Sequence, residues 1–176
     1  MIKNYINILK KHSNSRKDFD IVLNHSLIVF AKSLEIISKK SLFDKIDIDL
    51  IASGSILHDI GAFEFMKNFD QNQKNYLKHG VIGAKILRSE GLTKEALVCE
   101  KHIGAGLSKK YIIENNLPLP KKDFLPITLE QKIICYADKF HSKSGKKDDL
   151  ASIKKEMNEF GKEPLRRFLE LEKMFG

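Results

Sequence analysis

The stretch Ser55–Phe63, SILHDIGAF, ends an apolar run with a histidine and an aspartate, His58 and Asp59. Burying either side chain is costly unless another group pairs with it. We therefore expect this pair either to cap a helix or to face a charged group. Gly61 follows at once and favours a helix end here, letting the chain turn away. Neighbours on a regular helix point roughly 100° apart, so a helix end would allow both side chains to reach one place.

The sequence around this stretch has a helical pattern. Apolar residues recur at three- and four-residue steps from Phe19 to Ile37, as in an amphipathic helix. Asp47, Thr93 and Thr128 are expected to be the N-caps of three further helices. We find no convincing strand, internal repeat or low-complexity tract. The predicted fold class is therefore all-α, a helical bundle.

Length and composition predict one domain over residues 1–176, with a core at about 16–143 and a C-terminal helical extension at 144–176. Hydrophobic residues make up 42% of the chain and charged residues 31%, which is ordinary for a soluble globular protein. The longest apolar run, at 26–31, is closed by Lys32. The N-terminal segment lacks a cleavage site, so we expect an amphipathic helix there, no membrane contact and a cytoplasmic location.

The net charge of +8 comes from lysines spread along the whole chain. This balance is compatible with a phosphate-bearing ligand but does not require nucleic acid, and we do not expect nucleic-acid binding. Cys99 and Cys135 lie far apart in apolar surroundings without a CxxC motif. We expect both to be buried, reduced thiols.

Polar residues interrupt the apolar helical faces at several distant points of the chain. A single such histidine is more often a satisfied core residue than a ligand. Six such residues, four histidines and two aspartates, would each need a buried partner, and one bound cation would serve them all. Imidazole and carboxylate suit Fe, Mn, Zn or Ni, with Mg as a further option. The candidate metal ligands are His25, His58, Asp59, His79, His102 and Asp138.

A lone histidine, an HD pair and a distal aspartate resemble the HD-domain superfamily of metal-dependent phosphohydrolases. The motif LHDIG at 57–61, the upstream His25 and the segment IICYADK around Asp138 carry the resemblance. The intervening His79 and His102 resemble the two-metal subgroup, similar to hydrolases that split diadenosine tetraphosphate symmetrically. The segment HIGAG at 102–106 looks closest to a small, uncharacterised HD family. The GYP tripeptide of the cyclic-dinucleotide branch is absent, which argues against that branch.

The resemblance implies that Asp59 bridges two ions. His25, His58 and Asp138 would complete the site of one ion, and His79 and His102 that of the other. The implied activity is hydrolysis of a phosphate ester or anhydride in a nucleotide-like small molecule by metal-activated water, with His58 and Asp59 as the catalytic centre. Metal stoichiometry, one ion or two, stays open at this point.

Further residues are candidates for contacts with the substrate. Lys101 is a candidate catalytic residue because it precedes His102, and Lys78, Lys139 and Gly104 are candidates for substrate binding. Each lysine would equally fit a solvated position. Gly83 fits either a backbone approach to the site or a close packing contact.

Two other classes of function compete with the hydrolase. One is a non-catalytic HD module that binds a nucleotide or a metal, and the other is a di-iron HD oxygenase with a related ligand set. Exposed apolar residues of the last helix, at 164–175, would also allow a homodimer.

Overall fold

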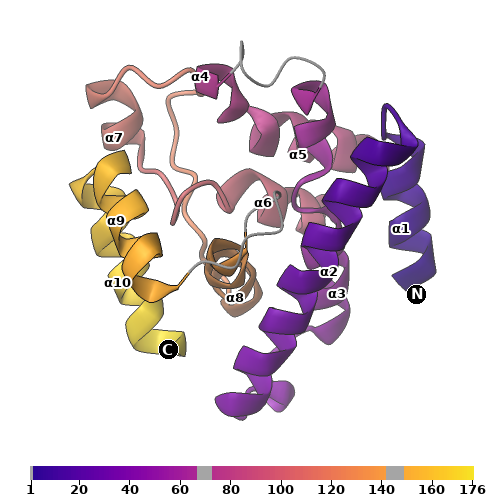
Figure 1. The fold of residues 1–176 in the computed structure, drawn as a ribbon, viewed down its shortest axis with the longest axis horizontal. Helices are drawn as coiled ribbons and strands as arrows, with labels where there is room; N and C mark the ends of the chain where they lie inside the picture. The colour runs from indigo at the N-terminus through magenta and orange to yellow at the C-terminus, as the bar shows by residue number, and fades with distance from the viewer. Residues whose placement is uncertain (1, 67–72, 142–148) are drawn as a thin grey trace.

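Helices account for the regular structure of the chain in the computed structural model, which describes residues 2–66, 73–141 and 149–176 (Figure 1). None of these residues forms a strand, although the backbones of Leu107 and Phe124 pair locally as an antiparallel bridge. The predicted all-α class is therefore confirmed. In chain order the elements are α1 (Ile2–Lys11), α2 (Arg16–Lys39), η1 (Phe43–Lys45), α3 (Ile48–Leu57), η2 (Ile60–Glu64), α4 (Gln73–Tyr76), α5 (His79–Ser89), α6 (Thr93–Lys101), α7 (Lys109–Glu114), α8 (Leu129–Ala137), η4 (Asp138–Phe140), α9 (Leu150–Phe160) and α10 (Lys162–Phe175).

Local sequence explains where most helices begin. The Ser15 hydroxyl accepts a hydrogen bond from the Asp18 amide, and the Asp47 carboxylate accepts one from the Leu50 amide. Thr128 caps α8 in the same way, as predicted. The prediction for Thr93 was wrong, because Leu92 is the N-cap of α6 and makes no side-chain cap bond. The amide of Leu92 bonds the Leu87 carbonyl, so the tight turn that ends α5 also sets the start of α6.

Helix α2 lies beside α3 and packs against α8, and these three helices share one core with α10 (Figure 1). A second core joins α1, α2, α3, η2, α5 and α6. Burial of these apolar faces, at roughly 25 cal/mol per Å², stabilises the bundle. The ends of α3, α6 and α8 are thereby held at fixed positions between the two cores.

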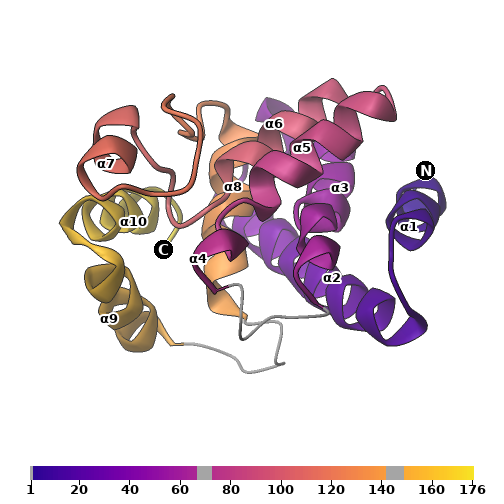
Figure 2. The same cartoon turned by 90° about the horizontal axis from the view of Figure 1, so that it is seen from above.

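The two ends of the chain lie on opposite sides of the molecule, with α1 at one side and α9 and α10 at the other (Figure 2). Helix α10 packs on α8, where Phe168 and Phe175 contact the ring of Tyr136. The turn before α10 also contacts α7, since the Tyr111 hydroxyl donates to the Phe160 carbonyl. The polar sequence at 69–74 predicts a loop and that at 142–148 a linker, but residues 67–72 and 142–148 lie outside the described residues.

Helix α2 is long and apolar enough to cross a membrane by length and composition alone. Core helices of soluble proteins pass the same test, and 39% of its most apolar window is buried in the protein. We therefore treat α2 as a core helix. Cys99 and Cys135 are buried free thiols, as predicted.

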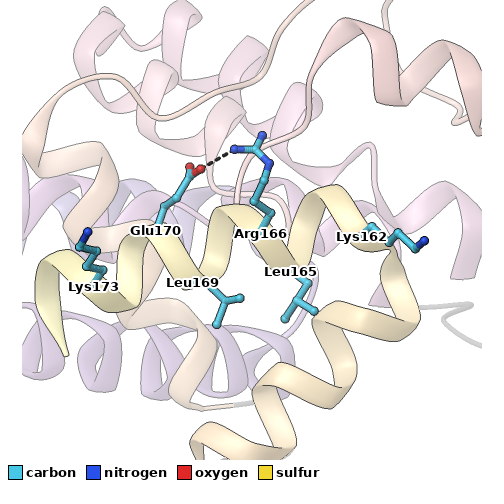
Figure 3. Close-up of a pocket in the computed structure, with 6 residues that line it drawn as sticks. All are labelled: Lys162, Leu165, Arg166, Leu169, Glu170 and Lys173. Atoms are coloured by element: carbon cyan, nitrogen blue, oxygen red, sulfur yellow. Dashed lines mark hydrogen bonds and ion pairs between the residues drawn. The ribbon is translucent and has the colours of Figure 1, made fainter.

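A shallow pocket lies on the outward side of α10 (Figure 3). Its volume is about 360 Å³, and Leu165 and Leu169 project beside an ion pair between Arg166 and Glu170. None of its lining residues belongs to the set of predicted metal ligands.

Candidate metal centre

The six predicted ligands come together at one place, where four helices begin or end against the middle of α2. His58 caps the C-terminus of α3, His102 that of α6 and Asp138 that of α8, whereas His79 is the first residue of α5. His25 reaches the same place from within α2. The cluster is buried, and even the most accessible of its side chains, that of Asp138, is only 11% exposed. The predicted helix end at the HD pair is confirmed.

Gly61 has a different role from the predicted one. It lies inside η2, and its φ is not positive, so it does not turn the chain away. A Cβ at this position would lie 2.5 Å from the backbone nitrogen of Gly83 and closer still to the carbonyl oxygen of His79. Gly83 in turn leaves room for Gly61 and for the Cys99 thiol. The two glycines let η2 and α5 touch through their backbones, which brings His79 to Asp59.

One group of ligand atoms surrounds the Oδ2 atom of Asp59. His25 Nε2 lies 3.3 Å from this oxygen and 2.9 Å from Asp138 Oδ1. His58 Nε2 lies 3.4 Å from Asp59 Oδ2 and 3.3 Å from Asp138 Oδ1. The two imidazole nitrogens are themselves 3.3 Å apart.

A second group surrounds the other oxygen of the same carboxylate. Asp59 Oδ1 lies 3.2 Å from His79 Nε2 and 3.6 Å from His102 Nε2, and these two nitrogens are 2.9 Å apart. The two oxygens of Asp59 therefore face two separate sets of donor atoms. This division would allow the carboxylate to contact an ion on each side.

Three of the four histidines are oriented by the same backbone contact. His58 Nδ1 bonds the Ser55 carbonyl at 2.8 Å, His79 Nδ1 bonds the Tyr76 carbonyl at 2.6 Å, and His102 Nδ1 bonds the Cys99 carbonyl at 2.7 Å. A carbonyl only accepts, so Nδ1 carries the proton in each ring. In the neutral form of each ring the lone pair is then on Nε2, which points into the cluster. Hydrogen bonds of this kind to the outer ring nitrogen fix the tautomer of metal-ligating histidines.

These tautomers leave lone pairs facing one another. Burial lowers the pKa of His102 to about 4, so this ring is neutral near pH 7. Its Nε2 then has no proton to share with His79 Nε2 at 2.9 Å, and a cation between the two nitrogens would remove the conflict. With metal–nitrogen distances of about 2.0–2.1 Å, two ligands of one ion are separated by about 2.9–3.4 Å at ordinary coordination angles. The separations within the two groups fall in this range, from 2.9 to 3.4 Å, except that of His102 Nε2 from Asp59 Oδ1, which is slightly longer at 3.6 Å. Both groups of residues are able to hold a metal ion.

The ionisation of Asp138 also suits a cation. Burial by itself raises the pKa of this carboxyl, but the Lys139 ammonium and the contacts with the His25 and His58 rings outweigh it. Together they hold the pKa of Asp138 well below its usual range. The carboxylate is thus charged and ready to act as a ligand at neutral pH.

Comparison with known proteins agrees with this site. The family model described as the HD domain matches residues 22–143. This chain belongs to the HD-domain family. The predicted membership in this superfamily of metal-dependent phosphohydrolases is confirmed, whereas the predicted two-metal subgroup stays a prediction.

Curated relatives of this HD domain include an uncharacterised protein and two tRNA methyltransferases. An uncharacterised protein of Methanocaldococcus jannaschii is 40% identical over 80% of this chain and 78% of its own length. A tRNA (cytidine(56)-2'-O)-methyltransferase of Thermoplasma volcanium is 34% identical over 68% of this chain, and its counterpart in Picrophilus torridus is 28% identical over 80%. The matched segment spans only 31% and 36% of those two enzymes. No solved structure matches the chain.

Of the three lysines predicted as site residues, only Lys139 contacts a residue of the cluster in the bonds described. The Lys139 ammonium lies 2.6 Å from Asp138 Oδ2 and 3.3 Å from the His102 carbonyl. The pKa of Lys101 is lowered by burial, against the opposing effect of Glu100 and with a further lowering by Lys122. These two charged neighbours, Glu100 and Lys122, are not members of the cluster. Lys78 precedes α5 and makes no side-chain cap bond. Lys101 and Lys78 remain predictions.

Gly104 adopts a left-handed backbone with φ of 58°, and a Cβ there would meet Phe160 and Leu107. Its left-handed turn thus lies near Phe160 at the end of α9, and its predicted contact with substrate stays a prediction. Sequence reasoning also missed the carbonyls that orient the rings. Each belongs to the residue three positions before its histidine, a spacing that is visible once the helix ends are known.

Proposed function

We propose that this HD domain is a metal-dependent phosphohydrolase that uses water to cleave a phosphate ester or anhydride in a nucleotide-like small molecule. The observation that carries the proposal is the division of the Asp59 carboxylate between two sets of donor atoms. Two adjacent ion sites sharing one carboxylate suit phosphoryl transfer, which depends mainly on positioning and charge neutralisation.

In this proposal Asp59 takes part in both ion sites. His25, His58 and Asp138 would hold one ion, and His79 and His102 the other. Nitrogen and oxygen donors favour Fe, Mn, Zn or Ni, and Mg is a weaker fit to a histidine-rich set. Divalent ions bound there would lower the pKa of water toward 7 and neutralise the charge of a phosphate.

The residues of the chain itself argue against a covalent mechanism. Burial raises the pKa of Cys135 to about 11 and that of Cys99 well above its usual value. Both thiols therefore stay protonated at neutral pH and are poor nucleophiles. The neighbouring hydroxyls of Ser26 and Ser55 are completely buried. Water is then the nucleophile that fits the described part of the chain, with His58 and Asp59 at the catalytic centre and Lys101, Lys78 and Gly104 as proposed contacts for the substrate.

A second candidate substrate is a phosphate ester of RNA. Two relatives are tRNA methyltransferases in which the matched segment is only about a third of the chain. A segment joined to a tRNA-modifying enzyme suggests a phosphate-containing substrate connected with tRNA. The net charge of +8 would favour such a polyanion, although the small nucleotide remains our first proposal.

Reconstitution and a substrate panel would test the proposal. Protein stripped with a chelator and reloaded with each ion in turn would be assayed for phosphate and nucleotide release from mono-, di- and dinucleoside polyphosphates and from tRNA. We expect turnover by at least one ion, and its loss in Asp59→Asn. Tight nucleotide binding without turnover would instead support the binding module. Oxygen consumption with a polyol or a phosphonate would support the oxygenase. Either result would overturn the hydrolase.

A further inference from the structure

Lys139 touches both halves of the candidate metal centre. Its ammonium lies 2.6 Å from Asp138 Oδ2, whereas the other oxygen, Oδ1, faces His25 and His58. The same ammonium lies 3.3 Å from the carbonyl of His102, whose ring belongs to the second group. The side chain is only 12% exposed, so this position is held by its surroundings.

The two oxygens of the Asp138 carboxylate therefore differ. Oδ1 faces the histidines and is free to bind an ion with them, whereas Oδ2 is held by the Lys139 ammonium. A carboxylate can bind a metal through one oxygen or through two, and the choice decides how many coordination positions stay open. The ammonium contact withholds Oδ2 from any ion near Oδ1. It also fixes the plane of the carboxylate, because Lys139 is itself tied to the His102 carbonyl.

We infer that Lys139 is a positioning residue, which keeps Asp138 a one-oxygen ligand and so preserves an open coordination position for water and substrate. This inference rests on the proposed metal site. It differs from a role in substrate binding, which sequence analysis predicted for Lys139, because the ammonium acts on a ligand of the site. Contacts to metal-ligating groups of this kind typically change metal affinity by about 10- to 100-fold when they are removed.

Replacement of Lys139 in the full-length chain with Co(II) as the probe ion tests the inference. In Lys139→Met we expect the visible Co(II) spectrum to weaken, because Asp138 becomes free to bind through both oxygens and the coordination number rises. We also expect the Co(II) affinity, measured by chelator competition, to change by about 10-fold, and kcat to fall more than KM rises. Lys139→Arg keeps a cation at this position and should restore much of the wild-type spectrum.

Lys78→Met is the matched control, since Lys78 directly precedes the ligand His79 but makes no side-chain cap bond to α5. This control should leave the Co(II) spectrum unchanged. Helical circular dichroism of each variant verifies that the bundle is intact. A Lys139→Met protein with the wild-type spectrum and Co(II) affinity would overturn the inference, and a rise in KM alone would return Lys139 to substrate binding. Failure of the wild-type protein to bind Co(II) would instead overturn the proposed function.

Discussion

Replacing Gly61 with alanine should separate η2 from α5 and thereby remove His79 from the metal centre. The added Cβ would lie 2.5 Å from the Gly83 nitrogen and 3.0 Å from the Gly83 Cα. Both atoms belong to backbone, which cannot rotate away as a side chain can. The two segments must therefore move apart by about 1 Å to reach a van der Waals separation near 3.5 Å. The distance from His79 Nε2 to Asp59 Oδ1, now 3.2 Å, would then exceed the range for ligands of one ion.

The expected cost is that of overpacking, about 1–3 kcal/mol. For a chain of this length each kcal/mol lowers Tm by about 2–4 °C. We expect Gly61→Ala to melt several degrees lower and to bind one ion where the wild type binds two. Differential scanning calorimetry and elemental analysis would measure the two effects.

Gly54→Ala is the matched control for this experiment. A Cβ at Gly54 would meet the Ile134 Cδ1 atom at 2.8 Å and a methyl of Val98 at 3.2 Å. These are side-chain ends that can shift, and alanine also favours the helical state of α3. The control should keep both ions and change Tm little. A Gly61→Ala protein with unchanged Tm and full metal content would refute the packing role that we assign to Gly61.

Three further predictions follow from the helix cap, the buried thiols and the second ion site. Asp47→Ala should destabilise the protein by about 1 kcal/mol. Asp47→Asn should cap nearly as well in thermal melts. The pKa of Asp47 is lowered by the Leu50 amide and by Lys94, so its contribution is present above about pH 4 and should vanish as the pH falls through the lowered value. Acid melts in which Asp47→Asn shows the same loss would contradict this assignment. Cys99 and Cys135 should react with iodoacetamide only after denaturation, and rapid labelling of the native protein would mean that the buried thiols become exposed. His79→Ala should retain one ion by elemental analysis while keeping its helical circular dichroism, and retention of two ions would remove His79 from the ligand set.

The sequence was sufficient to predict the fold class and the residues of the cluster. Asp47 and Thr128 are recognisable caps, because their chemistry acts within a few residues of chain. The HD pair and its distant partners follow a family spacing, which carries information about three-dimensional proximity that periodicity alone lacks. The structure then adds the contacts that make the predicted ligands neighbours.

Long-range backbone contacts were beyond sequence reasoning. Gly61 looked like a helix terminator, but its partner is Gly83 on another element, and local sequence does not report that contact. Lys139 follows Asp138 in the chain, and on a regular α-helix the two side chains would point apart. They meet in η4, a 3₁₀ turn, so the pairing depends on how α8 ends. Leu92 became a cap for a similar reason, because the preceding turn already determines where α6 begins.

The most direct test of the central claim is the metal content of the purified wild-type protein after reconstitution with a divalent ion. The two groups of donor atoms around Asp59 predict two ions per chain, both removable by chelator and both required for hydrolysis. A protein that binds one ion at saturation would reduce His79 and His102 to substrate contacts. A protein that binds none would contradict the account, because the inward-facing imidazole lone pairs would then have no cation to satisfy them.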